Sequence, residues 1–149
     1  MKNLFLAVAC VAAFAAQAQP APVAVASPWA RMVLQGQSNS AAYMTLTARE
    51  PLTLTGASTP AAGIVEVHEM WMDGDVMRMR AREGVALRAG EPLVLRPGGH
   101  HFMLMDLKAA FRPGTVVPMT LQFRDAQGKP RELQVQVPVA LAAPALHKQ

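Results

Sequence analysis

Two histidines and two methionines are the residues of this chain whose types and spacing could bind a metal ion. They follow the pattern H-x10-M-x21-H-x-M and are His68, Met79, His101 and Met103. Thioether sulfur is a soft donor that favours Cu(I), whereas Mg, Ca and Mn prefer oxygen ligands. Imidazole alone would also suit zinc, iron or nickel. The two methionines therefore narrow the expected metal to copper(I).

Packing is the main alternative explanation for the methionines, because Met also fills gaps in hydrophobic cores. The 10 methionines are unevenly spread, however, and those that crowd beside the histidines are Met70, Met72, Met77, Met79, Met103 and Met105. Cores built by packing prefer Leu, Ile and Val, so this crowding favours a metal site. We interpret Met70, Met72, Met77 and Met105 as packing around the site, with substitute ligands or a soft outer shell as the alternative.

Other polar residues near the four positions have simpler roles. His100 is adjacent to His101 and points to the opposite face of a strand, so His101 is taken as the ligand. Glu69, Asp73 and Asp75 could hold a hard metal, but the two aspartates are typical of a turn. No nucleophile, general base or second redox centre lies close to the four positions, which argues against an enzyme.

The first 18 residues have the features of a secretory signal. Lys2 begins a short charged region, 4–16 is apolar, and 16–18 supplies small residues at a cleavage site. The apolar run is too short for a membrane span, and no later segment resembles one. We therefore expect an exported protein without a membrane span in its mature form.

The one cysteine, Cys10, lies inside the apolar run and would be removed with it. Cleavage just before Cys10, as in a lipoprotein, is disfavoured because little apolar sequence precedes it. A mature chain without thiols excludes disulfides, thiol redox chemistry and a blue-copper centre, which needs a cysteine ligand.

The chain is long enough for one domain with its own hydrophobic core, so the metal is expected to be cargo or cofactor and not scaffold. We expect a flexible lead-in at 19–28, the domain at 29–140 and a tail at 141–149.

The formal charge is +4 at pH 7. Several arginines lie in the segment between the first and last expected ligands. The simpler interpretation is a solvated surface, and the alternative is a basic rim that docks an acidic partner. No basic run interleaved with aromatics suggests nucleic-acid binding.

Short alternating or β-branched runs separated by turn signals predict an antiparallel β-sandwich or small barrel. The runs are 41–47, 52–55, 64–72, 76–80, 85–87, 93–95, 101–107, 116–123 and 133–139. Residues 108–111 are the one candidate for a helical turn. A hairpin turn at 73–75 would bring His68 and Met79 close together, and His101 and Met103 would share one face of a strand.

Long stretches of the sequence resemble the periplasmic copper chaperone family named PCuAC. The segments are VEVHEM (65–70), DGDVMRMR (73–80), LRPGGHHFMLMDL (95–107) and GTVVPMTL (114–121), with WAR (29–31) and AAYM (41–44) matching the N-terminal signature. The ligand spacing is kept without an insertion. Residues 47–51 depart from the turn pattern of the family, and we interpret them as loop variation.

The resemblance implies a cupredoxin-like antiparallel β-sandwich with Greek-key connections that binds one Cu(I) near its surface. The family's ligands carry over to His68, Met79, His101 and Met103. The implied partner is the copper A subunit of cytochrome c oxidase, often alongside Sco-type proteins. Some members carry a second, Cu(II)-type site in a C-terminal extension, where this tail offers only His147. The alternative function is a secreted β-sandwich binding module without a metal role.

Overall fold

The computed structural model describes residues 21–144, and the secondary structure of this range consists of β-strands. The all-β class is thus confirmed, and each expected run corresponds to a strand. The strands are β1 (Val23–Arg31), β2 (Ser40–Ala48), β3 (Leu52–Ser58), β4 (Ala62–Asp73), β5 (Val76–Arg82), β6 (Val85–Leu87), β7 (Pro92–Leu95), β8 (His101–Leu107), β9 (Val116–Asp125) and β10 (Pro130–Ala140).

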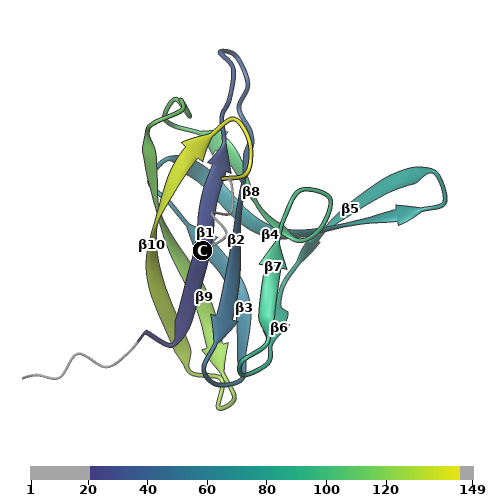
Figure 1. The fold of residues 1–149 in the computed structure, drawn as a ribbon, viewed down its shortest axis with the longest axis vertical. Helices are drawn as coiled ribbons and strands as arrows, with labels where there is room; N and C mark the ends of the chain where they lie inside the picture. Colours follow the sequence, from purple (N-terminus) through teal and green to yellow (C-terminus); the bar gives the residue numbers. More distant parts are fainter. Residues whose placement is uncertain (1–20, 145–149) are drawn as a thin grey trace, which may run out of the picture.

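The strands form two layers that face each other (Figure 1). They pair in the order β5-β4-β8-β2-β1-β10-β9-β3-β6, and β7 also pairs with β2. Every pairing is antiparallel except that of β1 with β10, which is parallel at Ala30↔Val139 and Arg31↔Ala140. The expected antiparallel sandwich is therefore mixed at this junction, where the edges of the two layers meet.

Alternating side chains of the strands fill the space between the layers. In β9, Val117, Met119, Leu121 and Phe123 are buried, while the residues between them are exposed or half-buried. This is the period of two that a half-buried strand requires. Phe102 of β8 is fully buried as well, so the residue next to His101 anchors its strand in the core.

Two local expectations are wrong. The lead-in expected at 19–28 contains the start of β1, which pairs with β2 from Val23 onward despite its small side chains and a register shift after Ala26. Pairing with a distant strand supplies order that local composition does not indicate. Residues 108–111 form no helical turn, because the buried Phe111 ties this segment to the core. The expected signal at 1–18 lies outside the described residues.

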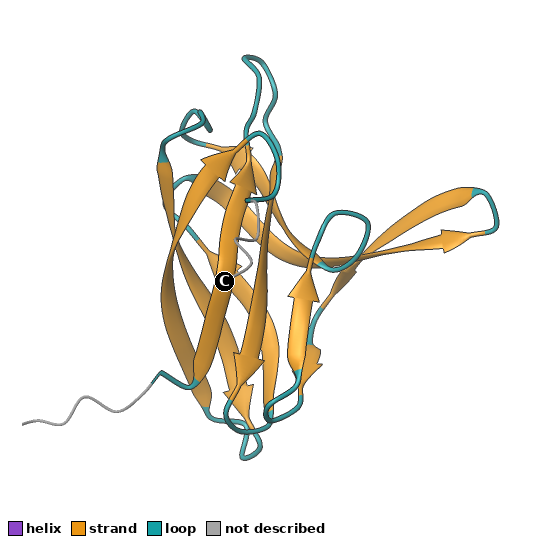
Figure 2. Cartoon of the chain, in the orientation of Figure 1, coloured by secondary structure: helices purple, strands orange, loops and turns teal. Residues whose placement is uncertain are grey.

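The ends of β4 and β5 leave the body as a two-stranded hairpin, which we call the arm (Figures 1 and 2). The pair Asp73↔Val76 closes it through a two-residue turn, and Gly74 has a φ of 62°. Glycine adopts this left-handed conformation without steric cost. The hairpin expected at 73–75 is confirmed, and every residue of β5 before Arg82 is exposed.

Candidate metal centre

His68 and His101 are direct cross-strand neighbours. The antiparallel register of β4 and β8 places them opposite each other, and their ring centroids lie 5.7 Å apart. Residues opposite each other in a sheet share one face, so both imidazoles project to the same side. Both residues are buried, with 9% of His68 and 3% of His101 exposed. Two strands far apart in the sequence thus bring two imidazoles together at one place.

The two methionines of the pattern lie on the same face as the histidines. Met103 follows His101 by two residues on β8, so the pleat directs it to that face, where it is half-buried. Met79 lies on β5 opposite Met70, and Met70 follows His68 by two residues on β4. Met79 is 48% exposed. The register therefore puts the four expected ligands on one face of three adjacent strands, where the arm joins the body.

A loop at residues 96–100 lies beside the two histidines. β7 and β8 both run antiparallel to β2, at Pro92–Leu95 and from His101 onward, so they form one line that the loop interrupts. The loop is closed by a hydrogen bond from the Arg96 N–H to the His100 carbonyl at 2.8 Å. The sequence predicts a turn at 97–99. In the structure the chain leaves β2 at this turn and then pairs with β2 again as β8.

The carbonyl of Gly99 in this loop fixes the orientation of His101. It accepts a hydrogen bond from the Met70 N–H at 3.3 Å and lies 3.1 Å from Nδ1 of His101. A carbonyl oxygen can only accept, so Nδ1 carries the ring proton and donates it. The lone pair of His101 is thereby left on Nε2, the atom that could bind a metal.

The imidazole of His68 is held by a carboxylate on its own strand. Nε2 lies 2.7 Å from Oε2 of Glu66, two residues earlier on the same face of β4. The carboxylate oxygen accepts a hydrogen bond from Nε2–H, which leaves the lone pair of the neutral ring on Nδ1. That Nδ1 is buried and has no hydrogen-bond partner among the described residues. A buried nitrogen without a partner is costly, and a soft metal ion would satisfy it.

The electrostatic surroundings of His101 favour its neutral form. Burial lowers the pKa of His101, the hydrogen bond with Gly99 opposes this, and the electrostatic influence of His68, Arg31 and His100 lowers it further. Only a neutral imidazole can bind a metal ion. His101 is therefore ready to act as a ligand at neutral pH.

The aromatic rings of Trp29 and Tyr43 lie beside His101. The ring centroids of Trp29 and Tyr43 are 4.7 Å apart, and those of Tyr43 and His101 are 6.3 Å apart. Burial raises the pKa of Tyr43, and the charge of Arg31 opposes this. Both aromatic residues belong to the segments at 29–31 and 41–44 that carry the resemblance. Their position gives that signature a physical role, because it shields one side of the imidazole from water.

The sequence interpretation missed three groups that shape this site. They are Glu66, the carbonyl of Gly99 and the ring of Tyr43. The spacing of Glu66 and His68 on one strand face was a usable signal, whereas the Gly99 contact depends on the loop conformation. His100 points away from His101, as expected, and lies 3.9 Å from Glu69.

Hard ligands do not gather in the described part of the chain, where no group of three or more His, Cys, Asp or Glu side chains could hold an ion. Asp73 instead pairs with Arg78 at 2.7 Å, and Glu69 pairs with arginines of β5. The arrangement of two imidazoles beside thioethers is suited to a soft monovalent ion.

Comparison with known sequences places the chain in a family. Residues 23–139 match the model of the LpqE-like family, described as "Putative lipoprotein LpqE-like". The chain is 32% identical over 118 residues to "Putative lipoprotein Lxx21020" of Leifsonia xyli subsp. xyli, which covers 78% of this chain and 69% of that protein. It is 34% identical over 114 residues to the uncharacterized protein RP573 of Rickettsia prowazekii, covering 71% of this chain and 63% of that protein.

Solved structures share the fold. Apo-DR1885 from Deinococcus radiodurans is 30% identical, with a TM-score of 0.56 over 93% of this chain and 92% of that chain. The structure named CuI-DR1885 is 33% identical, with a TM-score of 0.54 over 83% and 80%. The copper-bound PCuAC domain from PmoF2 is 23% identical, with a TM-score of 0.64 over 83% and 94%. The resemblance stated from the sequence is thus confirmed: the chain belongs to the LpqE-like family and has the cupredoxin-like β fold of PCuAC domains.

Proposed function

We propose that this protein is an exported copper(I) carrier that binds one Cu(I) through His68, Met79, His101 and Met103. The observation that carries this proposal is the pairing of two imidazoles, each held so that one nitrogen keeps a free lone pair. Further support comes from a relative, DR1885, whose solved structure is a Cu(I) form. The strands run from residue 23 to residue 140, which supports one domain that contains this site.

The geometry favours transfer over permanent storage or catalysis. Met79 is exposed, so a donor of a partner protein can approach the ion from the arm side. Transfer would then proceed by ligand exchange, in which the partner's donor binds as the thioether of Met79 leaves. The carboxylate at the site, Glu66, is engaged by His68, and thioethers and imidazoles supply no nucleophile suited to hydrolysis. We therefore propose a carrier and not an enzyme.

Copper binding is tested by anaerobic titration of Cu(I) against a competing chelator. We expect one tightly bound Cu(I) per chain, and loss of this binding in Met79→Leu and His101→Ala. Met119→Leu is the matched control, because this methionine is 2% exposed on β9, in the other layer. A wild-type protein that never competes with the chelator for Cu(I) would contradict the proposal and favour the alternative, a secreted binding module without a metal role.

The proposed acceptor is the copper A centre of cytochrome c oxidase, with a Sco-type protein as a second partner in delivery. This part rests on the resemblance to PCuAC proteins. An acceptor assay mixes the Cu(I)-loaded protein with an apo copper A domain and follows copper in the separated proteins. Copper is expected to move to the acceptor in the wild type, and its retention by the carrier would contradict this choice of acceptor.

We propose periplasmic export with cleavage after Ala18, which the lipoprotein names of relatives support only as far as export. The described residues contain no helix long and apolar enough to cross a membrane. N-terminal analysis of the mature protein should find Gln19 as the first residue. A mature chain that begins with a lipid-modified Cys10 would contradict cleavage at this site.

A further inference from the structure

The arm has two chemically different faces. The register of β4 and β5 pairs Met70 with Met79 and Met72 with Met77, so these four residues share what we call the thioether face. The opposite side, the charged face, presents residues that alternate with them along both strands. They are Glu69, Trp71, Asp73, Val76, Arg78, Arg80 and Arg82.

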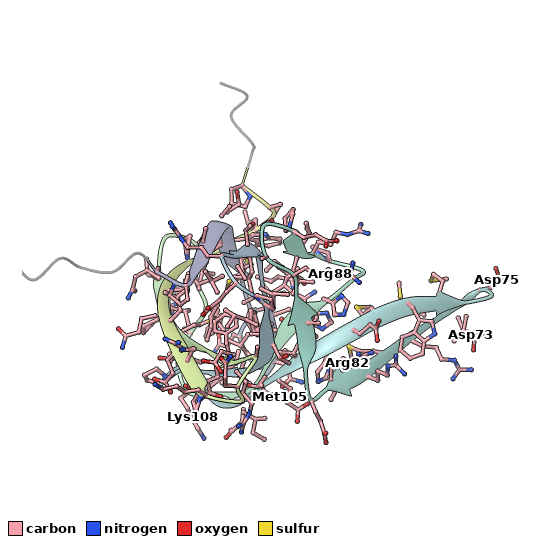
Figure 3. The ribbon with its side chains drawn as sticks, turned by 90° about the horizontal axis from the view of Figure 1, so that it is seen from below. Asp73, Asp75, Arg82, Arg88, Met105 and Lys108 are labelled. Carbon is pink, nitrogen blue, oxygen red and sulfur yellow. The ribbon has the colours of Figure 1, made fainter. Side chains whose placement is uncertain are left out.

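The charged face is internally paired. Arg78 binds Asp73 at 2.7 Å near the tip, and Arg80 and Arg82 bind Glu69 at 2.9 and 3.0 Å. Isolated two-stranded hairpins are marginally stable in water, and cross-strand pairs of opposite charge add stability to them. These contacts therefore account for the arm holding its shape where it extends past the body (Figure 3).

The thioether face contributes little to the fold. Met72 is 56% exposed, Met77 51% and Met79 48%, and none of them belongs to the buried core. Val, Ile, Thr and aromatic residues are better strand formers than Met, so strand stability does not explain four methionines here. An exposed patch of large apolar side chains usually has a function. Thioether sulfur is what these side chains have in common, and it favours Cu(I).

We propose that Met70, Met72 and Met77 form a second, weaker Cu(I) site on the arm, which loads the site at the paired histidines. This inference rests on the proposed copper-carrier function. Met72 and Met77 are directly opposite each other, and Met70 lies on the same face one rung closer to the body. Thioether sulfurs alone bind the ion less strongly than a set that includes two imidazoles, so the ion would move inward.

The spacing of the rungs permits transfer without release of the ion. Residues two apart on a strand are about 7 Å apart along the backbone. A methionine side chain has three rotatable bonds, so sulfurs of neighbouring rungs can meet. An ion bound by Met72 and Met77 can therefore add Met79 before Met72 leaves. The copper stays Cu(I) throughout, and no proton is exchanged because thioethers carry none.

The test follows the methionine methyl groups of the full-length mature protein by NMR during anaerobic Cu(I) titration. We expect the first equivalent to shift the methyl signals of Met79 and Met103. Further Cu(I) should shift those of Met70, Met72 and Met77 until a second ion is bound. In Met72→Leu/Met77→Leu this second phase should be lost, while the affinity of the first site stays within about twofold, as expected for sites that do not share ligands.

A second variant separates this inference from the carrier proposal. His68→Ala/His101→Ala removes the paired imidazoles, and the arm methyl signals should still shift when Cu(I) is added. If the first site fails in the wild type but the arm signals shift, the arm binds Cu(I), whereas its loading role and the carrier proposal are contradicted.

Three results would overturn the arm site. The first is an absence of arm methyl shifts in wild-type protein at several equivalents of Cu(I). The second is a second binding phase that persists unchanged in Met72→Leu/Met77→Leu. The third is a Met72→Leu/Met77→Leu variant that binds Cu(I) as the wild type does but no longer associates with the apo copper A domain. That result would make the thioether face a protein-docking surface.

Discussion

At the scale of single residues, a carboxylate and a backbone carbonyl decide which nitrogen of each imidazole is free. Glu66 accepts a hydrogen bond from Nε2–H of His68, and the Gly99 carbonyl accepts one from Nδ1–H of His101. The two rings therefore present different nitrogen atoms from neighbouring strands. Groups that orient a metal-binding imidazole typically contribute to metal affinity, so we expect Glu66 and the Gly99 carbonyl to contribute here.

Glu66→Gln should weaken Cu(I) binding by about 10- to 100-fold, the range typical when a group that orients a ligand is changed. The uncharged amide is a poorer acceptor for the His68 proton, so the ring is held less firmly and its Nδ1 becomes less basic. Competition titration measures the effect. Glu132→Gln is the matched control, because this glutamate is exposed on β10 in the other layer, and an equal loss in both variants would contradict the role of Glu66.

The stability of the copper-free protein should decrease as pH falls below about 6.5, the ordinary histidine pKa. Burial lowers the pKa of folded His101, so below that pH the unfolded chain binds more protons than the folded one. The stability contribution is complete above the unfolded pKa and is lost as pH falls through the folded pKa. Urea denaturation from pH 7.5 to 5 measures it, and a His101→Gln variant should show a smaller slope. An identical slope in both proteins would assign the pH dependence to other groups.

At the scale of elements, the loop at 96–100 is the part that places the Gly99 carbonyl beside His101. Gly98 has a φ of 82° and Gly36 a φ of 88°, and neither has a heavy atom within 4 Å of an added Cβ. Gly98→Ala and Gly36→Ala should therefore each lower the free energy of unfolding by about 1 to 2 kcal/mol from backbone strain alone.

These two variants form a matched pair for testing the proposed copper site. Gly98→Ala disturbs the loop that orients His101, whereas Gly36 lies in the connection between β1 and β2. Only Gly98→Ala should weaken Cu(I) binding in the competition titration. Equal affinities in the two variants would show that the loop does not control the orientation of His101.

Local sequence patterns predicted most strands but not their partners. Alternation identified β9, and the Asp73-Gly74-Asp75 sequence identified the hairpin turn between β4 and β5. The beginning of β1 was missed because small residues such as Ala24 and Ala26 carry no alternating signal. The alignment of β7 and β8 along β2 was also missed, because it depends on pairing with a distant strand. The four expected ligands could be named from spacing, yet their common face required the register.

At the scale of the whole molecule, the core and the proposed metal site are separate structures that share β8. Phe102 and Leu104 are fully buried between the layers, while His101 and Met103 face the other way. The copper-free protein should therefore keep its β-sheet circular dichroism and unfold cooperatively. Added Cu(I) should raise the Tm because it binds only the folded state. A copper-free chain without a cooperative transition would mean that the metal is part of the scaffold.

The central claim is that two imidazoles and two thioethers bind one ion on the face shared by β8, β4 and β5. X-ray absorption spectroscopy at the copper edge, on the protein loaded with one equivalent of Cu(I), measures the ligand set directly. We predict two imidazole nitrogens and two thioether sulfurs in the first coordination shell. A shell of nitrogen and oxygen atoms without sulfur would contradict the claim.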